Sequence, residues 1–104
     1  MKVTIIIPCY NASAYIASSI SSIQSQTLTD WEMIIVDDGS TDNSADIVQQ
    51  FSNKDPRIKL VQKANGGTAS ARKLGLEHAT GEYIQFLDAD DSIDTDKLSI
   101  QVRF

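Results

Sequence analysis

The chain has 104 residues, the length of one small domain, and 41% of them are hydrophobic, which is enough to build a core. The formal net charge of −5 argues against a nucleic-acid-binding protein, which would present a basic surface. No run of 18 apolar residues occurs, so the sequence predicts no membrane-spanning helix. Cys9 is the only cysteine, which favours a reducing, cytoplasmic compartment. We expect it to be a small buried residue, not a nucleophile.

Four short apolar runs, rich in branched and aromatic residues, predict β-strands that alternate with segments of helical spacing. The predicted strands cover residues 3–8, 31–36, 57–62 and 82–87. The predicted helices cover residues 11–26, 42–52, 65–79 and 95–104. This alternation predicts an α/β domain with a Rossmann-like parallel sheet, right-handed crossovers and helices on both faces.

Local signals predict where two of the helices begin and end. Ser40 or Thr41 is expected to cap the second helix, whose first turn would carry Asp42. Gly81 is expected to end the third helix as a C-terminal glycine. His78, near that end, is expected on the surface without a catalytic role.

Polar residues follow every predicted strand. These segments cover residues 8–11, 37–40, 65–68 and 88–91. The carboxyl ends of parallel strands meet at one edge of a sheet, and ligands of such sheets bind there. We therefore expect the four segments to form one site.

The last of these segments contains three carboxylates. Asp88, Asp90 and Asp91 directly follow an apolar strand, and burying three like charges is costly unless something compensates them. A divalent cation such as Mg²⁺ or Mn²⁺ would do so, since these ions prefer carboxylate oxygens. The alternative is a solvated turn in which Asp88 or Asp91 caps the next helix.

Two residues after the first and second strands are candidates for contacting a nucleotide. Asp38, which follows Asp37, can accept a hydrogen bond from a base or a sugar, and the alternative is a capping turn. Tyr10 can stack on a base, and the alternative is ordinary edge packing. We expect Asp38→Ala to weaken nucleotide binding without unfolding the domain, because a turn carboxylate contributes little to a core.

The third polar segment, Asn-Gly-Gly-Thr at residues 65–68, resembles a phosphate-binding turn at a helix N-terminus. It matches neither the Walker pattern nor the dinucleotide pattern, and a plain loop before a helix is the alternative. Arg72, one turn inside that helix, is the natural counter-charge for a diphosphate. A solvated helix face would look similar.

Taken in order, the segments at residues 3–11, 35–42, 65–72 and 81–91 resemble the family 2 glycosyltransferases, enzymes of the GT-A fold. The resemblance covers essentially the whole chain. It implies a nucleotide-diphosphate sugar donor, usually a uridine one, and a Mg²⁺ or Mn²⁺ cofactor. The nucleotide-binding residues that it implies are Pro8, Tyr10, Asp38, Arg72 and Asp88, and the metal ligands that it implies are Asp90 and Asp91.

The resemblance also implies an inverting displacement, in which a carboxylate base accepts the proton of the acceptor hydroxyl. No residue of the chain can be assigned as that base, so we expect it beyond Phe104. Residues 1–104 would then be the donor-binding part of a domain truncated at its C-terminus, inactive alone. The expected acceptor is a saccharide or a lipid-linked acceptor, and the expected location is the cytoplasm, with the inner face of the membrane as the alternative within it. Homo-oligomers and peripheral membrane association stay open.

Two alternative hypotheses assign the chain to other functional classes. The first is a non-catalytic nucleotide-binding module that keeps the fold. The second is an unrelated α/β signalling module with acidic turns, similar to a receiver domain.

Overall fold

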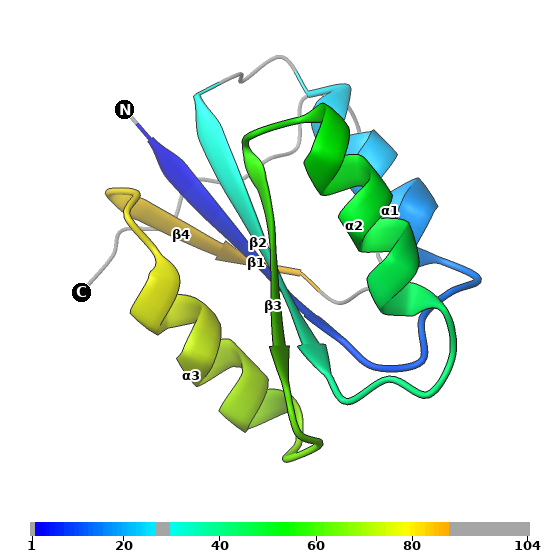
Figure 1. The fold of residues 1–104 in the computed structure, drawn as a ribbon. Coiled ribbons are helices and arrows are strands. Elements are labelled where there is room, and N and C mark those ends of the chain that lie inside the picture. Colours follow the sequence, from blue (N-terminus) through cyan, green and yellow to red (C-terminus); the bar gives the residue numbers. More distant parts are fainter. Residues whose placement is uncertain (1, 27–29, 88–104) are drawn as a thin grey trace.

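The structure is a computed structural model that describes residues 2–26 and 30–87 (Figure 1). Strands and helices alternate along this part of the chain, as the sequence predicts. The strands are β1 (Val3–Cys9), β2 (Trp31–Asp38), β3 (Ile58–Lys63) and β4 (Tyr83–Phe86). The helices are α1 (Ile16–Gln24), α2 (Ser44–Lys54) and α3 (Thr68–His78). The helix predicted at residues 95–104 lies outside the described residues.

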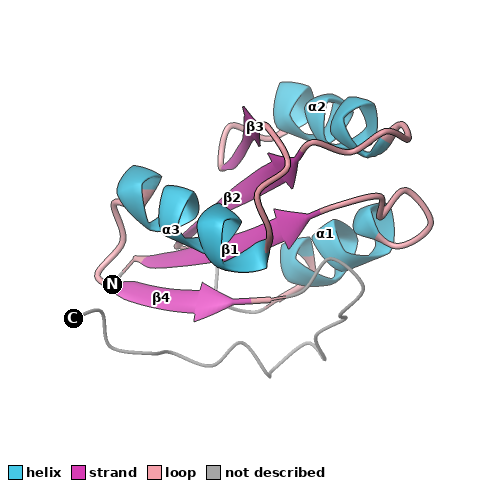
Figure 2. Ribbon diagram, turned by 90° about the horizontal axis from the view of Figure 1, so that it is seen from below, coloured by secondary structure: helices cyan, strands magenta, loops and turns pink. Residues whose placement is uncertain are grey.

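The four strands form one parallel sheet in the order β3-β2-β1-β4. The chain steps outward from β1 to β2 and β3, and then returns past β1 to β4 (Figure 2). Crossover connections keep one hand, so a reversal of direction moves the connecting helix to the other face. Accordingly α1 and α2 lie on one side of the sheet and α3 lies on the other (Figure 1). The predicted α/β fold with helices on both faces is confirmed.

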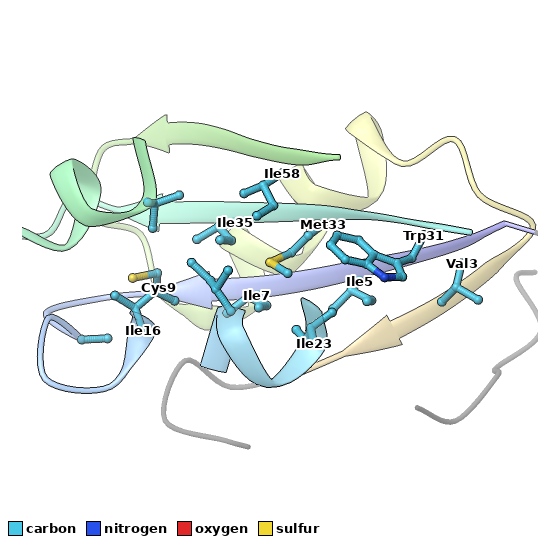
Figure 3. Packing of buried hydrophobic residues seen from close by; sticks show 13 residues of the cluster. Val3, Ile5, Ile7, Cys9, Ile16, Ile23, Trp31, Met33, Ile35 and Ile58 are labelled. Atoms are coloured by element: carbon cyan, nitrogen blue, oxygen red, sulfur yellow. The ribbon is translucent and has the colours of Figure 1, made fainter. Parts of the chain in front are cut away.

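The larger core lies between the sheet and helices α1 and α2 (Figure 3). Alternate residues of the central strands, such as Ile5, Ile7 and Met33, are fully buried on this face. They pack in one cluster with Ile16 and Ile23 of α1. Central strands covered on both faces read as continuous apolar runs, which explains why β1 and β2 stand out in the sequence.

A smaller cluster lies under α3 and contains Ile34, Val36 and Ala71. Gly75 of α3 lies directly on the sheet, and a Cβ atom there would collide with the side chain of Ile6. The helix is therefore held close to β1 and β2. None of the described helices is long and apolar enough to cross a membrane.

Two of the predicted helix boundaries are wrong. Helix α2 begins at Ser44, so Ser40 and Thr41 do not cap it and Asp42 precedes it. Asp42 instead acts from outside the helix, where its Oδ1 accepts a hydrogen bond from the Ser44 N–H at 2.9 Å. Helix α1 covers Ile16–Gln24 and is therefore shorter than the helix predicted at residues 11–26.

The role predicted for Gly81 is also wrong. Helix α3 ends at His78, and its last cap residue is Ala79 in an extended conformation. Gly81 is needed for close packing, since a Cβ atom there would lie 2.8 Å from the backbone nitrogen of Thr4. Its own N–H donates to Thr4 Oγ1 at 2.8 Å, which fixes the start of β4 beside β1.

A buried carboxylate, Glu32 on β2, ties together the edge of the sheet opposite the predicted site. Its Oε2 accepts hydrogen bonds from Thr4 Oγ1 at 2.6 Å and from the N–H and Oγ1 of Thr80 at 2.7 and 2.8 Å. Lys59 Nζ donates to Oε1 at 3.1 Å. Burial alone would raise the pKa of Glu32, but these hydrogen bonds outweigh it and lower the pKa to about 2.

We predict that Glu32→Gln destabilises the fold at pH 7 by about 2 to 3 kcal/mol, because the amide supplies a donor where three donors already converge. The folded-state pKa lies below the ordinary value of 4.5, so this stabilisation is complete above that pH and is lost as the pH falls toward 2. Urea unfolding at pH 7, 5 and 3 should therefore show the variant approaching the wild type in acid. A difference that stays constant with pH would contradict this account.

Candidate functional site

The pairing of β1 with β2 brings the first two polar segments together at the carboxyl edge of the sheet. The register runs from Val3 opposite Trp31 to Cys9 opposite Asp37, so the two strands end together. Strand β3 pairs with β2 up to Lys63, opposite Asp38, and adds the third segment, 65–68. The expected gathering at one edge is confirmed for these three segments, and residues 88–91 lie outside the described residues.

The register also tells which face each candidate residue occupies. Side chains alternate along a strand, and paired residues of parallel strands share a face. Asp38 lies on the α3 face with Val36, and Pro8 lies there too because it pairs with Val36. Phe86 of β4 pairs with Ile6 and lies on the same face. The candidate nucleotide site is thus the α3 side of the carboxyl edge.

The carboxylate of Asp38 accepts three hydrogen bonds from this edge of the sheet. Asp38 is 4% exposed, and both oxygens of its carboxylate bond to the loop before α3. Oδ1 accepts from Lys63 Nζ at 2.8 Å and from the Gly66 N–H at 2.9 Å, while Oδ2 accepts from the Gly67 N–H at 3.0 Å. Burial alone would raise the pKa of Asp38, but these bonds outweigh it and lower the pKa below its usual value. Asp38 is therefore ionised in the folded protein at neutral pH.

The premise behind the expectation for Asp38→Ala is wrong. Asp38 is the last residue of a buried strand, not part of a solvated turn. Its carboxylate supports the segment 65–68, which the sequence analysis compared with a phosphate-binding turn. In this structure the N–H groups of Gly66 and Gly67 are occupied by Asp38 itself.

Gly39 lets the loops after β2 and β3 approach each other. Its φ is +76°, and a Cβ atom there would lie 2.8 Å from the backbone nitrogen of Asn65. The Asn65 side chain donates from Nδ2 to the Asp38 carbonyl at 3.0 Å. A larger residue at position 39 would therefore separate the loops and break the contact that aligns the glycine segment.

Asp37 and Cys9 lie on the opposite face, toward α1 and α2. Asp37 accepts a long hydrogen bond from the Ser40 N–H at 3.3 Å, within the loop that precedes α2, so it does not cap the helix. Burial and the negative charge of Asp37 raise the pKa of the Cys9 thiol to about 11. Cys9 is buried, as expected, and a protonated thiol does not act as a nucleophile.

Tyr10 and Arg72 complete the described part of the site. Tyr10 follows the last residue of β1 and is 52% exposed, so its ring is accessible to a ligand. Arg72, on the second turn of α3, places its guanidinium carbon 5.7 Å from the centre of the Phe86 ring. That contact brings Arg72 to the end of β4, where the chain continues toward Asp88.

Sequence reasoning missed three residues that shape this edge. Lys63 forms an ion pair with Asp38, and the ring of Phe86 lies against the guanidinium of Arg72. Asn11 forms a hydrogen bond that connects the loops after β1 and β2. A lysine at the end of one strand and an aspartate at the end of another are visible in the sequence. Only the strand register shows that they are partners.

The predicted metal ligands, Asp90 and Asp91, lie outside the described residues, as does Asp88. Within residues 2–26 and 30–87 no group of three or more histidine, cysteine, aspartate or glutamate side chains could hold a metal ion. His78 is exposed at the end of α3.

The family model described as "Glycosyl transferase family 2" matches residues 4–104. The chain belongs to this family. The resemblance drawn from the ordered motifs is thereby confirmed.

Relatives of the family 2 chain include longer bacterial proteins. It is 47% identical over 103 residues to an uncharacterized glycosyltransferase of Haemophilus influenzae and 48% identical over 103 residues to the putative teichuronic acid biosynthesis glycosyltransferase TuaG of Bacillus subtilis. Each alignment covers 98% of this chain. The chain spans 41% of the length of either relative.

Solved structures show that the fold is the N-terminal part of a GT-A domain. S. aureus TarS 1–349 in complex with UDP matches with a TM-score of 0.86 and 35% identity, over 94% of this chain and 30% of that one. The mannosyltransferase PcManGT of Pyrobaculum calidifontis, in complex with GDP-Man and Mn²⁺, matches with a TM-score of 0.76 and 32% identity, over 86% of this chain and 28% of that one.

We predict that Asp38→Asn lowers the free energy of unfolding by about 2 kcal/mol, nearly as much as Asp38→Ala, because an amide nitrogen would face one of three fixed donors. Urea unfolding measures the loss, and hydrogen exchange should show faster exchange of the Gly66 and Gly67 amides. The matched control is Asp46→Asn, an exposed acid of α2 on the opposite face of the sheet from α3. An Asp38→Asn protein as stable as the control would contradict the structural role.

Proposed function

We propose that the chain is the donor-binding part of a glycosyltransferase that transfers a sugar from a UDP-sugar to an acceptor hydroxyl with inversion. Family membership establishes the transferase class, and the observation that carries the finer proposal is the shared position of Pro8, Asp38 and Arg72. All three belong to the α3 side of one sheet edge. A base, a diphosphate and a sugar span such an edge when they bind outside the strand ends.

Asp38 can support the loop and contact the base at once. A carboxylate offers about four acceptor positions, and the described donors to Asp38 are three: Lys63, Gly66 and Gly67. Among the described residues only Gly67 donates to Oδ2, which leaves that oxygen one position for a ligand. Uracil presents an N–H at the middle of its pairing edge, whereas cytosine presents an acceptor there. Asp38 would therefore accept from uracil and repel cytosine.

Tyr10 and Arg72 supply the remaining contacts that this proposal assigns within the described residues. The accessible Tyr10 ring would stack on the base, and Pro8, half-buried beside β2, would border it. Arg72 would pair with the diphosphate, because a guanidinium donates to two phosphate oxygens together. Asp88 would contact the ribose.

The proposal assigns Mg²⁺ or Mn²⁺ to Asp90 and Asp91, whose carboxylate oxygens suit these ions. When bound, the ion would neutralise charge on the departing diphosphate. A carboxylate base from beyond Phe104 would take the acceptor proton. The acceptor would be a saccharide or a lipid-linked saccharide at the inner face of the membrane, in line with the teichuronic acid pathway named for TuaG.

The main competitor is a nucleotide-binding module of the same family that performs no transfer. It would bind the nucleotide in the same way, so binding alone does not separate the two. Release of UDP from a UDP-sugar by the full-length protein, in the presence of an acceptor, does.

We predict that the full-length protein binds UDP more tightly with Mn²⁺ than without it. Asp90→Ala should remove at least about 90% of this metal-dependent gain, since it deletes a proposed ligand. Glu77→Ala, which deletes an exposed acid of α3, is the matched control and should bind like the wild type. Isothermal titration calorimetry with and without Mn²⁺ gives the comparison. Equal UDP affinity in the two conditions would overturn the metal assignment.

Nucleotide preference tests the assignment of Asp38. We predict that the wild type binds UDP at least about tenfold more tightly than CDP, because an acceptor facing the carboxylate leaves both without a partner. Competition titrations against a fluorescent UDP derivative measure the ratio. Equal affinities would show that Asp38 does not read the pairing edge.

A further inference from the structure

Asn11, directly after Tyr10, has an unusual backbone conformation. Its φ is +48°, and it is the only residue other than glycine with a positive φ in the described part of the chain. Residues with a Cβ atom avoid this region, and asparagine is among the few that tolerate it. Glycine would adopt this conformation at less cost, and the feature that asparagine adds is a side chain that can form hydrogen bonds. Conformations of this kind concentrate at functional sites.

The side chain of Asn11 bonds to the loop after β2. Its Oδ1 accepts from the Thr41 N–H at 2.8 Å and, at longer range, from Thr41 Oγ1 at 3.3 Å. The backbone N–H of Asn11 donates to Ser40 Oγ at 2.9 Å. Asn11 is thus both a donor and an acceptor of hydrogen bonds between the loops after β1 and β2.

The bonds of Asn11 begin where the sheet ends. The ladder between β1 and β2 stops at the pair of Cys9 and Asp37. Beyond it, the Asn11 N–H donates to Ser40 Oγ in the loop after β2, and the Ala12 N–H donates to Ser44 Oγ at the start of α2, both at 2.9 Å. Asn11 therefore continues the alignment of the two strands into their loops.

We propose that Asn11 is a positioning residue that sets the Tyr10 ring relative to Asp38 across the nucleotide base. This inference rests on the proposed function. The two base contacts come from different strands, and Tyr10 is half exposed, so packing alone restrains it weakly. The left-handed turn at Asn11, held by Thr41, fixes the backbone on the far side of Tyr10. Binding then costs less ordering of that ring.

Three variants of the full-length protein test this role through UDP affinity. Asn11→Gly permits the same φ but lacks the acceptor, and its dissociation constant should rise about fivefold. Asn11→Asp keeps an acceptor oxygen and should stay within about twofold of the wild type. Thr41→Val is the matched control, because it removes only the longer hydroxyl bond and leaves the backbone N–H in place.

A double-mutant cycle with Tyr10→Ala separates positioning from general loop stability. If Asn11 acts through the ring, Asn11→Gly should change the affinity by less than about twofold once the ring is absent. A purely structural role would leave the fivefold loss intact. Hydrogen exchange of the Thr41 amide, measured without nucleotide, should be faster in Asn11→Gly and near wild-type in Asn11→Asp.

The outcomes distinguish this inference from the function on which it rests. A wild-type protein that binds no uridine nucleotide overturns the proposed function and the positioning role with it. A wild-type protein that binds UDP, together with an Asn11→Gly variant of equal affinity, overturns the positioning role alone. So does a fivefold loss that persists in the Tyr10→Ala background. Asn11→Gly relieves the strained φ, so the variant is expected to fold.

Discussion

The structure depends on the parallel pairing of β1 with β2, two strands buried on both faces at the centre of the sheet. Seven consecutive residue pairs, from Val3 and Trp31 to Cys9 and Asp37, hold the strands flush at their carboxyl ends. A slip of one residue would move every side chain of a strand to the opposite face, out of the cluster in which it packs. The positions of Tyr10 and Asp38 follow from that register, since each comes directly at or after the end of its strand.

The loops beyond the sheet are then aligned by hydrogen bonds that involve side chains. Asp38 holds the loop after β3 through Gly66 and Gly67, and Asn11 holds the loop after β1 against Thr41. The loop after β2 is common to both sets of contacts. A ligand bound at this edge would meet a surface that is already ordered, which lowers the entropy that binding must overcome.

The sequence predicted the alternation of strands and helices along the chain and the edge where three of the four polar segments meet, because these follow from apolar spacing and from general rules of parallel sheets. It could not reveal which residues would become partners across the fold. Lys63 and Asp38 are distant in sequence and meet only through the register of β3 with β2. Gly81 looked like a helix terminator, but its close approach to Thr4 is a tertiary contact. Local propensity carries no information about such contacts.

Glu32 and Asp38, two of the three buried acids of β2, differ in how many hydrogen bonds their carboxylates accept. Glu32 receives three donors on Oε2 and Lys59 on Oε1, four in all, and these bonds join neighbouring strands and the turn before β4. Asp38 receives two donors on Oδ1 but one on Oδ2 among the described residues. Both acids are buried and both have a lowered pKa, so neither property distinguishes structure from function. The proposed base contact of Asp38 is compatible with its three donors from the described residues, because a carboxylate offers about four acceptor positions.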